Sequence, residues 1–325
     1  MNDRPAGKPG DRIRLTKLSG ALPELIGLPP AVRPGDRVGV AALSGVVDPD
    51  RLEAGLEALR QLGFEPVVAD NLSTATGLFA GDDDRRLAAF HDLLAEPGLR
   101  AVVFARGGHG LLRLLPRIDW ALLARRPLAY VGYSDLTPFL LEVVRRLGVA
   151  AFHGPMVAVD LARGLSGAET DSLLGALAGE LPASVPVRCS GTATTSRGRL
   201  MGGCLSMLTA TLGTPFAPAL GDSLLFWEDV DEPLYRLDRM LTQLRLSGSL
   251  AGLRGMVVGE LQPADETPDL QPTLPEILEE LAREHGWCVA YGCPSGHCQP
   301  NLTLPLGLEA RLDGADGRLI VGEPG

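Results

Sequence analysis

The stretch RVGVAA at residues 37–42 is a short apolar run with the composition of a buried β-strand. A segment with apolar residues at helical spacing follows it at residues 50–62. Asp48 can cap the first turn of this helix, Pro49 suits its first position, and Gly63 can end it. The unit then repeats, with strands expected at residues 65–68, 101–104 and 128–131 and a helix at residues 83–94. This alternation predicts a parallel sheet covered by helices on both faces.

The length of 325 residues suits two domains. We expect a flexible leader at residues 1–34, because it is rich in Gly, Pro and charge, and an N-terminal parallel-sheet α/β domain of the Rossmann or flavodoxin-like kind at residues 35–165. Residues 166–197 are rich in small and polar residues, with a short helical segment but no strong strand, which is typical of a connection. A smaller, mixed α/β C-terminal domain is expected at residues 198–325. Its predicted strands are residues 223–227, 255–259 and 287–290, and its predicted helices are residues 204–212, 235–246 and 274–284.

The charge balance excludes some partners. The chain has 30 Lys and Arg residues against 40 Asp and Glu residues, a net charge of −10. This charge repels nucleic-acid phosphates and anionic lipid headgroups, so we expect neither nucleic acid nor a membrane as partner. The N-terminal stretch carries no apolar run long enough for a signal peptide or a membrane span, which favours a cytoplasmic location.

The five cysteines are odd in number and widely spread, and a chain of this length does not need disulfides. They are Cys189, Cys204, Cys288, Cys293 and Cys298. The last three are spaced by five residues and lie close to His297, which could suggest zinc, but tight structural zinc sites use Cys-x2–4-Cys pairs. We therefore expect reduced thiols, no metal and no other cofactor.

Two loops follow predicted strands at the edge of the sheet where ligands bind in such folds. The sequence GYSD at residues 132–135 places Ser134 on a turn between a strand and a helix, where a hydroxyl can project as a nucleophile. The turn lacks the second glycine of the usual Gly-x-Ser-x-Gly elbow, and Ser134 could instead simply cap the helix that follows.

The other loop, RGGHG at residues 106–110, can supply backbone N–H groups from Gly107 and Gly108 to an oxyanion. The alternatives are a tight turn or a phosphate-binding loop, as in a nucleotide-binding oxidoreductase. Its spacing is not Gly-x-Gly-x-x-Gly, and it follows the third strand rather than the first, which disfavours the phosphate-binding loop.

A serine nucleophile needs an imidazole to accept its proton and an acid to orient that imidazole. Of the five histidines, His91 and His285 lie on predicted helices and are expected at the surface. The sequence does not rank His109, in the glycine loop, His153, in a possible wall of the site, and His297, in a loop between strands.

The acid can come from the run FWEDVDE at residues 226–232, which puts four carboxylates just after an apolar strand. Most charge clusters are solvated turns. Glu228, however, comes directly after the strand, where the backbone is rigid enough to hold an imidazole in place.

The sequence resembles the LD-carboxypeptidases, a family of serine peptidases that includes microcin-immunity enzymes. The blocks that carry the resemblance occur in family order from about residue 35 to the end of the chain. They are RGGHGLLRLLP (106–116), GYSDLT (132–137), FHGPM (152–156), GG (202–203), GTP (213–215), LFWEDVDE (225–232) with YRLDRML (235–241), and GH (296–297) followed by LPLG (304–307).

The resemblance implies a catalytic triad of Ser134, Glu228 and His297, with an oxyanion hole made by the backbone N–H groups of Gly108 and Asp135. It also implies a parallel α/β domain followed by a smaller mixed one, a homodimer, and release of the terminal D-alanine from murein tetrapeptide during cell-wall recycling in the cytoplasm.

Arg106, His109 and His153 are the candidates for lining the substrate pocket. The chain departs from the family pattern at His109, where tyrosine is common, and at Leu43, Cys204 and Cys298, which affects substrate selection more than mechanism. No tryptophan occurs between residues 161 and 197 to stack on a nucleotide base, which disfavours the microcin-immunity branch and its peptide-nucleotide conjugates. A non-catalytic peptide-binding scaffold is the alternative from another class.

Overall fold

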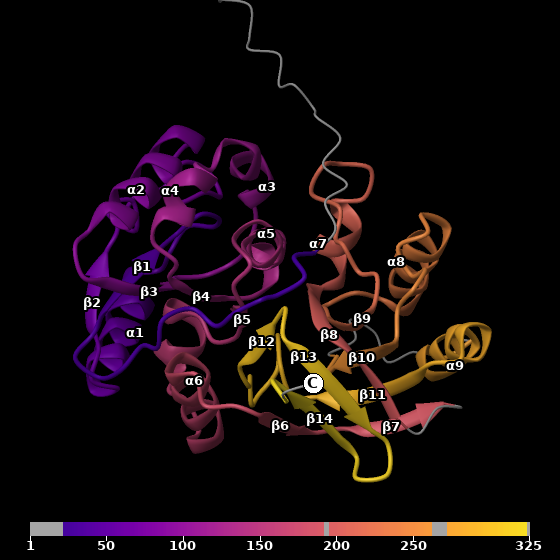
Figure 1. Cartoon of the computed structure of the whole chain (residues 1–325). Helices are drawn as coiled ribbons and strands as arrows, with labels where there is room; N and C mark the ends of the chain where they lie inside the picture. The colour runs from indigo at the N-terminus through magenta and orange to yellow at the C-terminus, as the bar shows by residue number, and fades with distance from the viewer. Residues whose placement is uncertain (1–21, 192–194, 262–271, 324–325) are drawn as a thin grey trace, which may run out of the picture.

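The computed structural model describes residues 22–191, 195–261 and 272–323. They form an α/β structure with a six-stranded sheet on the left of Figure 1 and an eight-stranded sheet on its right.

The first sheet has the strand order β12-β5-β4-β3-β1-β2. Its strands are β1 (Arg37–Ala41), β2 (Glu65–Val68), β3 (Leu99–Phe104), β4 (Ala129–Gly132), β5 (Ala151–His153) and β12 (Leu304–Leu306). Strands β1 to β5 are parallel, whereas β12 is antiparallel to β5. The four strands predicted in this region are confirmed, with ends that shift by no more than two residues.

Helices cover both faces of this sheet: in Figure 1, α2 and α4 lie above it and α1 and α6 below it. The helices of this part are α1 (Pro49–Gln61), α2 (Asp83–Ala95), α3 (Leu111–Leu114), α4 (Trp120–Arg125), α5 (Thr137–Leu147) and α6 (Gly167–Ala178). Three short turns complete it, namely η1 (Leu115–Arg117), η2 (Ser134–Leu136) and η3 (Val157–Leu161). The predicted cap is confirmed, because the Asp48 side chain accepts a hydrogen bond of 2.9 Å from the Arg51 N–H.

The second sheet has the strand order β6-β14-β13-β8-β9-β10-β11-β7. Its strands are β6 (Ala183–Pro186), β7 (Arg188–Gly191), β8 (Thr195–Cys204), β9 (Ser223–Glu228), β10 (Gly255–Gly259), β11 (Cys288–Cys293), β13 (Glu309–Asp313) and β14 (Arg318–Val321). Its central strands β8 to β11 are parallel, and the outer ones are antiparallel. The helices α7 (Leu205–Ala210), α8 (Leu234–Leu246) and α9 (Leu274–His285) lie on the right of Figure 1.

The segment at residues 166–197 corrects one expectation. It was predicted to lack a strong strand, but it contains α6 and also β6 and β7, which form the two opposite edges of the second sheet. An edge strand pairs on one side only and need not be continuously apolar, so ASVP and RCSG carry little strand signal.

The leader was expected to stay flexible through residue 34, but the chain contacts the rest of the protein from residue 22 onward, and residues 1–21 lie outside the described part. The Gly27 N–H donates to the Gly148 carbonyl at 2.9 Å, and the Arg199 side chain donates to the Pro23 carbonyl at 2.6 Å. Val32 is buried. Buried and packed apolar side chains, with these hydrogen bonds, hold a segment that its composition alone marks as mobile.

The two sheets approach each other where β8 meets the start of α5. The Cys204 N–H at the end of β8 donates to the Thr137 hydroxyl at 3.0 Å. Gly203 has a φ of +142°, and a Cβ on it would come within 2.6 Å of the same hydroxyl, so only glycine fits there. This close contact brings the carboxyl ends of β8 and β9 towards the loop that follows β4.

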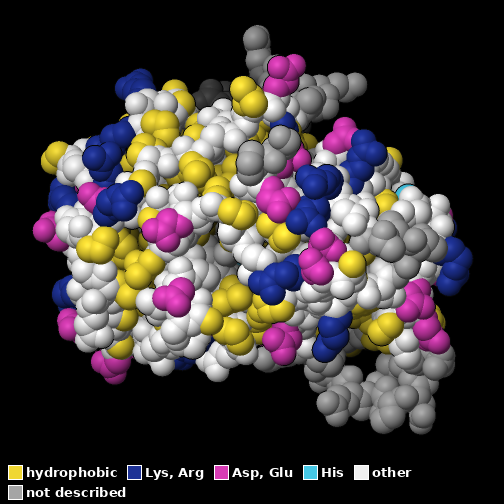
Figure 2. Space-filling view, turned by 60° about the horizontal axis from the view of Figure 1, so that its bottom comes forward, with side chains coloured by type: hydrophobic (Ala, Val, Ile, Leu, Met, Phe, Trp, Pro, Cys, Tyr) yellow, Lys and Arg dark blue, Asp and Glu magenta, His cyan; other side chains and the backbone are white. Residues whose placement is uncertain are grey.

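The surface is mixed in charge on the face drawn in Figure 2, where basic and acidic side chains are interspersed rather than gathered by sign. Among the helices that the structure describes, none combines the length and the apolar character needed to cross a bilayer.

Candidate active site

Ser134 lies two residues after the end of β4 in a left-handed backbone conformation, with a φ of +64°. A non-glycine residue in this conformation costs about 1–3 kcal/mol, and such strain collects at functional sites. The alternative role as a helix cap is not observed, since Leu136 occupies the N-cap position of α5 and no side chain caps it. The strained turn therefore presents a half-buried hydroxyl rather than a helix cap.

Asp135 ties together three loops at the carboxyl ends of the strands. Its buried carboxylate accepts hydrogen bonds from the Ser44 hydroxyl at 2.6 Å and from the Leu111 N–H at 2.9 Å. Burial raises the pKa of this carboxyl despite these donors. The loops after β1, β3 and β4 are thus fixed relative to one another beside Ser134.

The glycine loop lies against the serine. A Cβ on Gly107 would stand 2.9 Å from the Ser134 Cβ and 3.0 Å from its Oγ, closer than packed atoms come. The Gly107 carbonyl accepts a hydrogen bond of 3.1 Å from the Gly45 N–H. This loop follows β3, as predicted. It can lie this close to Ser134 because Gly107 has no side chain.

Glu228 and His297 form a tight pair on the second sheet. Glu228 is the last residue of β9 and is fully buried, and its Oε2 accepts from His297 Nδ1 at 2.7 Å and from the His297 backbone N–H at 3.1 Å. The imidazole keeps 20% of its side-chain surface exposed. A carboxylate held this firmly fixes the orientation of the ring and directs its other nitrogen outward.

In this pair, burial and the charge of the partner shift each pKa in opposite directions. Burial would lower the pKa of His297, but the Glu228 carboxylate outweighs it and raises that pKa. Burial would likewise raise the pKa of Glu228, but the hydrogen bond from His297 lowers it. The pair therefore favours an ionised carboxylate that stabilises a protonated imidazole.

The serine loop reaches this pair through Tyr133, whose ring packs edge-on against the His297 ring with centroids 4.9 Å apart. Among the hydrogen bonds of the described side chains, none joins Ser134 to His297. Catalytic hydrogen bonds are often long before substrate binds. The structure thus brings the neighbour of Ser134 into contact with the imidazole.

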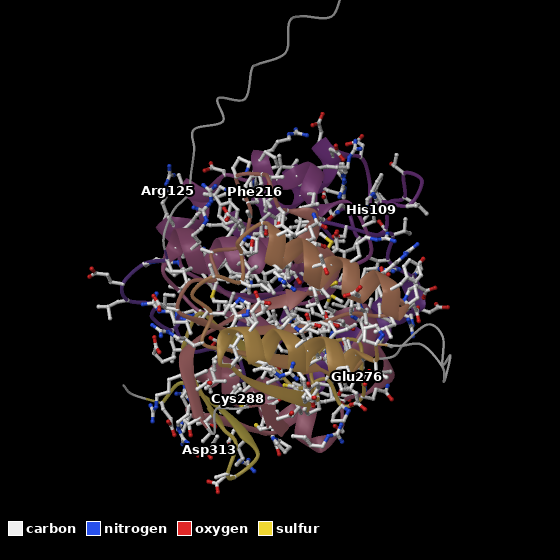
Figure 3. All side chains as sticks on the ribbon, turned by 90° about the vertical axis from the view of Figure 1, so that its right-hand side faces the viewer. His109, Arg125, Phe216, Glu276, Cys288 and Asp313 are labelled. Atoms are coloured by element: carbon white, nitrogen blue, oxygen red, sulfur yellow. The ribbon has the colours of Figure 1, made fainter. Side chains whose placement is uncertain are left out.

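The three predicted pocket residues lie in different surroundings. Arg106 is half-buried at the start of the glycine loop. His109 is exposed, with its ring 5.5 Å from that of Phe79, and Figure 3 shows it at the margin of the molecule. His153 was expected to line the pocket, but it is fully enclosed, and the rings of Tyr133 and Phe226 pack against it.

His153 is also an unusual buried histidine. Neither of its ring nitrogens has a hydrogen-bond partner in the described part of the protein. Its ring packs against Tyr133 and against Phe226, at 5.7 and 5.0 Å between centroids. Burial lowers its pKa to about 4, so it is neutral near pH 7.

Sequence reasoning missed the residues that hold the loop carrying His297. The Asn301 side chain accepts from the Gly296 N–H at 2.8 Å, and the Asn301 N–H donates to Glu169 at 2.8 Å. Asp160 accepts from the Asn301 amide at 3.4 Å. No spacing in the sequence points to this cluster, because its partners lie more than 130 residues apart.

The cysteines have free thiols, and Cys204 and Cys298 lie close to the site. The Cys204 thiol is within hydrogen-bonding reach of Ser206 at 3.2 Å, and that of Cys298 donates to the Pro300 carbonyl at 3.2 Å. Burial raises the pKa of both thiols, that of Cys298 to about 12. Within residues 22–191, 195–261 and 272–323, no three His, Cys, Asp or Glu side chains gather in a way that could hold a metal ion.

Comparison with known proteins identifies the family. Residues 38–154 match the profile described as the LD-carboxypeptidase N-terminal domain, and residues 197–312 match that of the LD-carboxypeptidase C-terminal domain. The chain is 33% identical over 290 residues to a probable murein peptide carboxypeptidase of Bacillus subtilis, covering 84% of this chain and 88% of that protein. It is 33% identical over 281 residues to the murein tetrapeptide carboxypeptidase of Pseudomonas aeruginosa, covering 82% and 89%.

A solved structure agrees with these matches. The muramoyltetrapeptide carboxypeptidase of Oxalobacter formigenes superposes with a TM-score of 0.80 at 29% identity, covering 88% of this chain and 99% of that one. Profiles of both domains, the curated relatives and a structural match over 88% of this chain point to one group of peptidases. The chain therefore belongs to the LD-carboxypeptidase family.

Proposed function

We propose that this protein is a serine carboxypeptidase that hydrolyses an L,D-peptide bond and releases the terminal D-alanine of murein tetrapeptide. The observation that carries the proposal is the buried Glu228 carboxylate bonded to His297 at 2.7 Å, beside the strained turn that holds Ser134. The murein names of the relatives support this substrate class. The setting we propose is cell-wall recycling in the cytoplasm by a homodimer.

In the first half of the reaction, the Ser134 hydroxyl attacks the carbonyl carbon of the scissile bond, while His297 Nε2 accepts its proton. Glu228 holds the Nδ1–H and stabilises the imidazolium that forms. The lowered pKa of Glu228 suits this role, because the carboxylate stays ionised at neutral pH. The imidazolium then gives its proton to the leaving amine, and D-alanine departs.

In the second half, a water molecule attacks the acyl-enzyme ester, again with His297 as base, and the shortened peptide leaves with a new carboxylate. The serine recovers its proton from the imidazolium. Both halves use the same imidazole, so a ring held in one orientation serves every proton transfer.

The developing oxyanion needs N–H donors close to Ser134. We assign them to the backbone of Gly108 and Asp135. The approach of Gly107 to Ser134 supports this assignment, since the loop can only come so near without a side chain. The Gly108 N–H donates to no other backbone carbonyl among the described loops, so it is free to bind an oxyanion.

The proposal is tested with Ser134→Ala, incubated with murein tetrapeptide and with tripeptide, followed by chiral analysis of the released amino acid. We expect wild type to release D-alanine from the tetrapeptide only, and the variant to lose about 10⁴–10⁶-fold in kcat because the nucleophile is gone. Ser249→Ala, at a surface serine bonded to Ser247, is the matched control and keeps full activity. Wild-type rates in Ser134→Ala would contradict the assignment of the nucleophile.

A further inference from the structure

We propose that Arg106 binds the terminal carboxylate of the substrate and so restricts the enzyme to the last residue of a peptide. This inference rests on the proposed function, because it names how the same site would recognise its substrate.

The position of Arg106 supports this role. The residue begins the glycine loop directly after β3, next to Gly107, which lies against Ser134. Its guanidinium faces the turn after β1, where Nη1 donates to the Val46 carbonyl at 3.0 Å. Its Nη2 stands 3.6 Å from the place that a Cβ on Gly108 would occupy. The positive charge is therefore beside the N–H group assigned to the oxyanion hole.

The charge of Arg106 has no counter-ion within the described residues, since no carboxylate oxygen lies within 4.0 Å of its nitrogens. Other arginines near the site are paired: Arg113 contacts Asp83 at 2.9 Å, and Arg163 contacts Asp160 at 3.3 Å. The Arg106 Nε is buried and has no hydrogen-bond partner. A half-buried guanidinium with unused donors costs free energy unless a ligand supplies the acceptors.

The chemistry of those donors points to a carboxylate. A guanidinium presents N–H groups in a planar fork that matches two carboxylate oxygens. An enzyme that removes one terminal residue has a carboxylate one residue away from the attacked carbonyl, a span of at most about 3.6 Å along the chain. Because the Arg106 Nη2 stands 3.6 Å from the place that a Cβ on Gly108 would occupy, a carboxylate bound there is at the right scale of distance from the oxyanion.

The experiment compares two substrates that differ only at the terminus, a murein tetrapeptide with a free carboxylate and the same peptide as a terminal amide. We expect wild type to prefer the acid in kcat/KM by about 10–100-fold, as for the loss of one charge-assisted hydrogen-bonded pair. Arg106→Met should lose this preference by slowing only the acid, and Arg106→Lys should keep part of it because a point charge remains.

Arg113→Met is the matched control, because it removes the same charge from a nearby arginine that already has a partner. It should leave the acid-to-amide ratio unchanged. Because the ratio is measured within each variant, a reduced folded fraction in Arg106→Met cancels out. An unchanged preference in that variant, or an equal loss for both substrates, would overturn the inference. A wild-type protein that releases nothing from either peptide would instead contradict the proposed function itself.

Discussion

At the scale of single residues, the site depends on the absence of a side chain at Gly107 and on the pKa of His297. Gly107 leaves room for Ser134, and Glu228 sets the proton affinity of His297. Variants at these positions should therefore alter turnover.

Gly107→Ala should reduce kcat/KM by at least about 100-fold, because the new methyl group would come within 3.0 Å of the Ser134 Oγ and displace the proposed oxyanion donors. Gly167→Ala is the control, since a Cβ there meets no atom within 4 Å. Both variants should keep the far-UV circular dichroism of wild type. Full activity in Gly107→Ala would show that the loop does not contact the reacting serine.

The pH dependence of kcat/KM should reflect the Glu228–His297 pair. His297 must be neutral to accept a proton, and Glu228 raises its pKa, so the acid limb of kcat/KM should lie above the ordinary histidine value of about 6.5. Asp229 and Asp160 also raise this pKa, while buried His153 stays neutral near pH 7. Glu228→Gln should shift the His297 titration, followed by NMR, to lower pH. An unshifted titration would contradict the coupling.

The same pKa shifts determine how the stability of the fold changes with pH. His297 has a raised pKa in the folded state, so its contribution is complete below the unfolded pKa and is lost as pH rises through the folded one. Glu228 has a lowered pKa, so its contribution is lost as pH falls through that value. The pair thus stabilises the fold most in mildly acidic solution, below the pH at which the enzyme turns over fastest.

At the scale of elements, the loop between β11 and β12 carries His297 and has no regular structure of its own. Asn301 holds the loop in place, because its side chain accepts a hydrogen bond from the Gly296 N–H within the loop and its own N–H donates to Glu169 at the start of α6. The geometry of the His297 imidazole thus depends on a helix from a distant part of the chain.

Asn301→Ala should leave the buried Gly296 N–H without a partner and lower the free energy of unfolding by about 1–3 kcal/mol. Because the imidazole loses its support, kcat should fall more than KM rises. Gln299→Ala is the control, since this exposed side chain in the same loop forms no hydrogen bond with another described residue. Denaturant melts and steady-state kinetics on both variants check the prediction, and equal behaviour of the two would contradict it.

At the scale of the whole molecule, the first sheet contains one strand that comes from the C-terminal half of the chain. Strand β12 comes from the C-terminal half but completes the first sheet, and β6 and β7 close opposite edges of the second. The predicted division into leader, two domains and connection stays a prediction. Strands from the predicted connection and from the predicted C-terminal domain nevertheless pair across its boundaries. The first sheet is thus incomplete without β12 from the C-terminal half, whereas every strand of the second sheet comes from residues 183–321.

We therefore expect a single cooperative unfolding transition. In Trp120→Phe, the remaining tryptophans, Trp227 and Trp287, belong to the part of the chain around the second sheet, whereas circular dichroism reports on all of it. The fluorescence and circular dichroism midpoints in denaturant should coincide. Two separated midpoints would show that the halves unfold independently.

The sequence by itself determined the strands β1 to β4 and the helices α1 and α2, because their apolar periods and caps are local properties of the chain. It also identified the serine turn, the glycine loop and the acidic run, since turn chemistry is read from neighbouring residues. Local patterns did not rank His109, His153 and His297, and it was the family resemblance that implied His297. Only the tertiary structure pairs Glu228 with His297, encloses His153 and leaves His109 exposed. Such contacts join residues far apart in the chain, and the physical forces that select them are packing and burial, which no local pattern encodes.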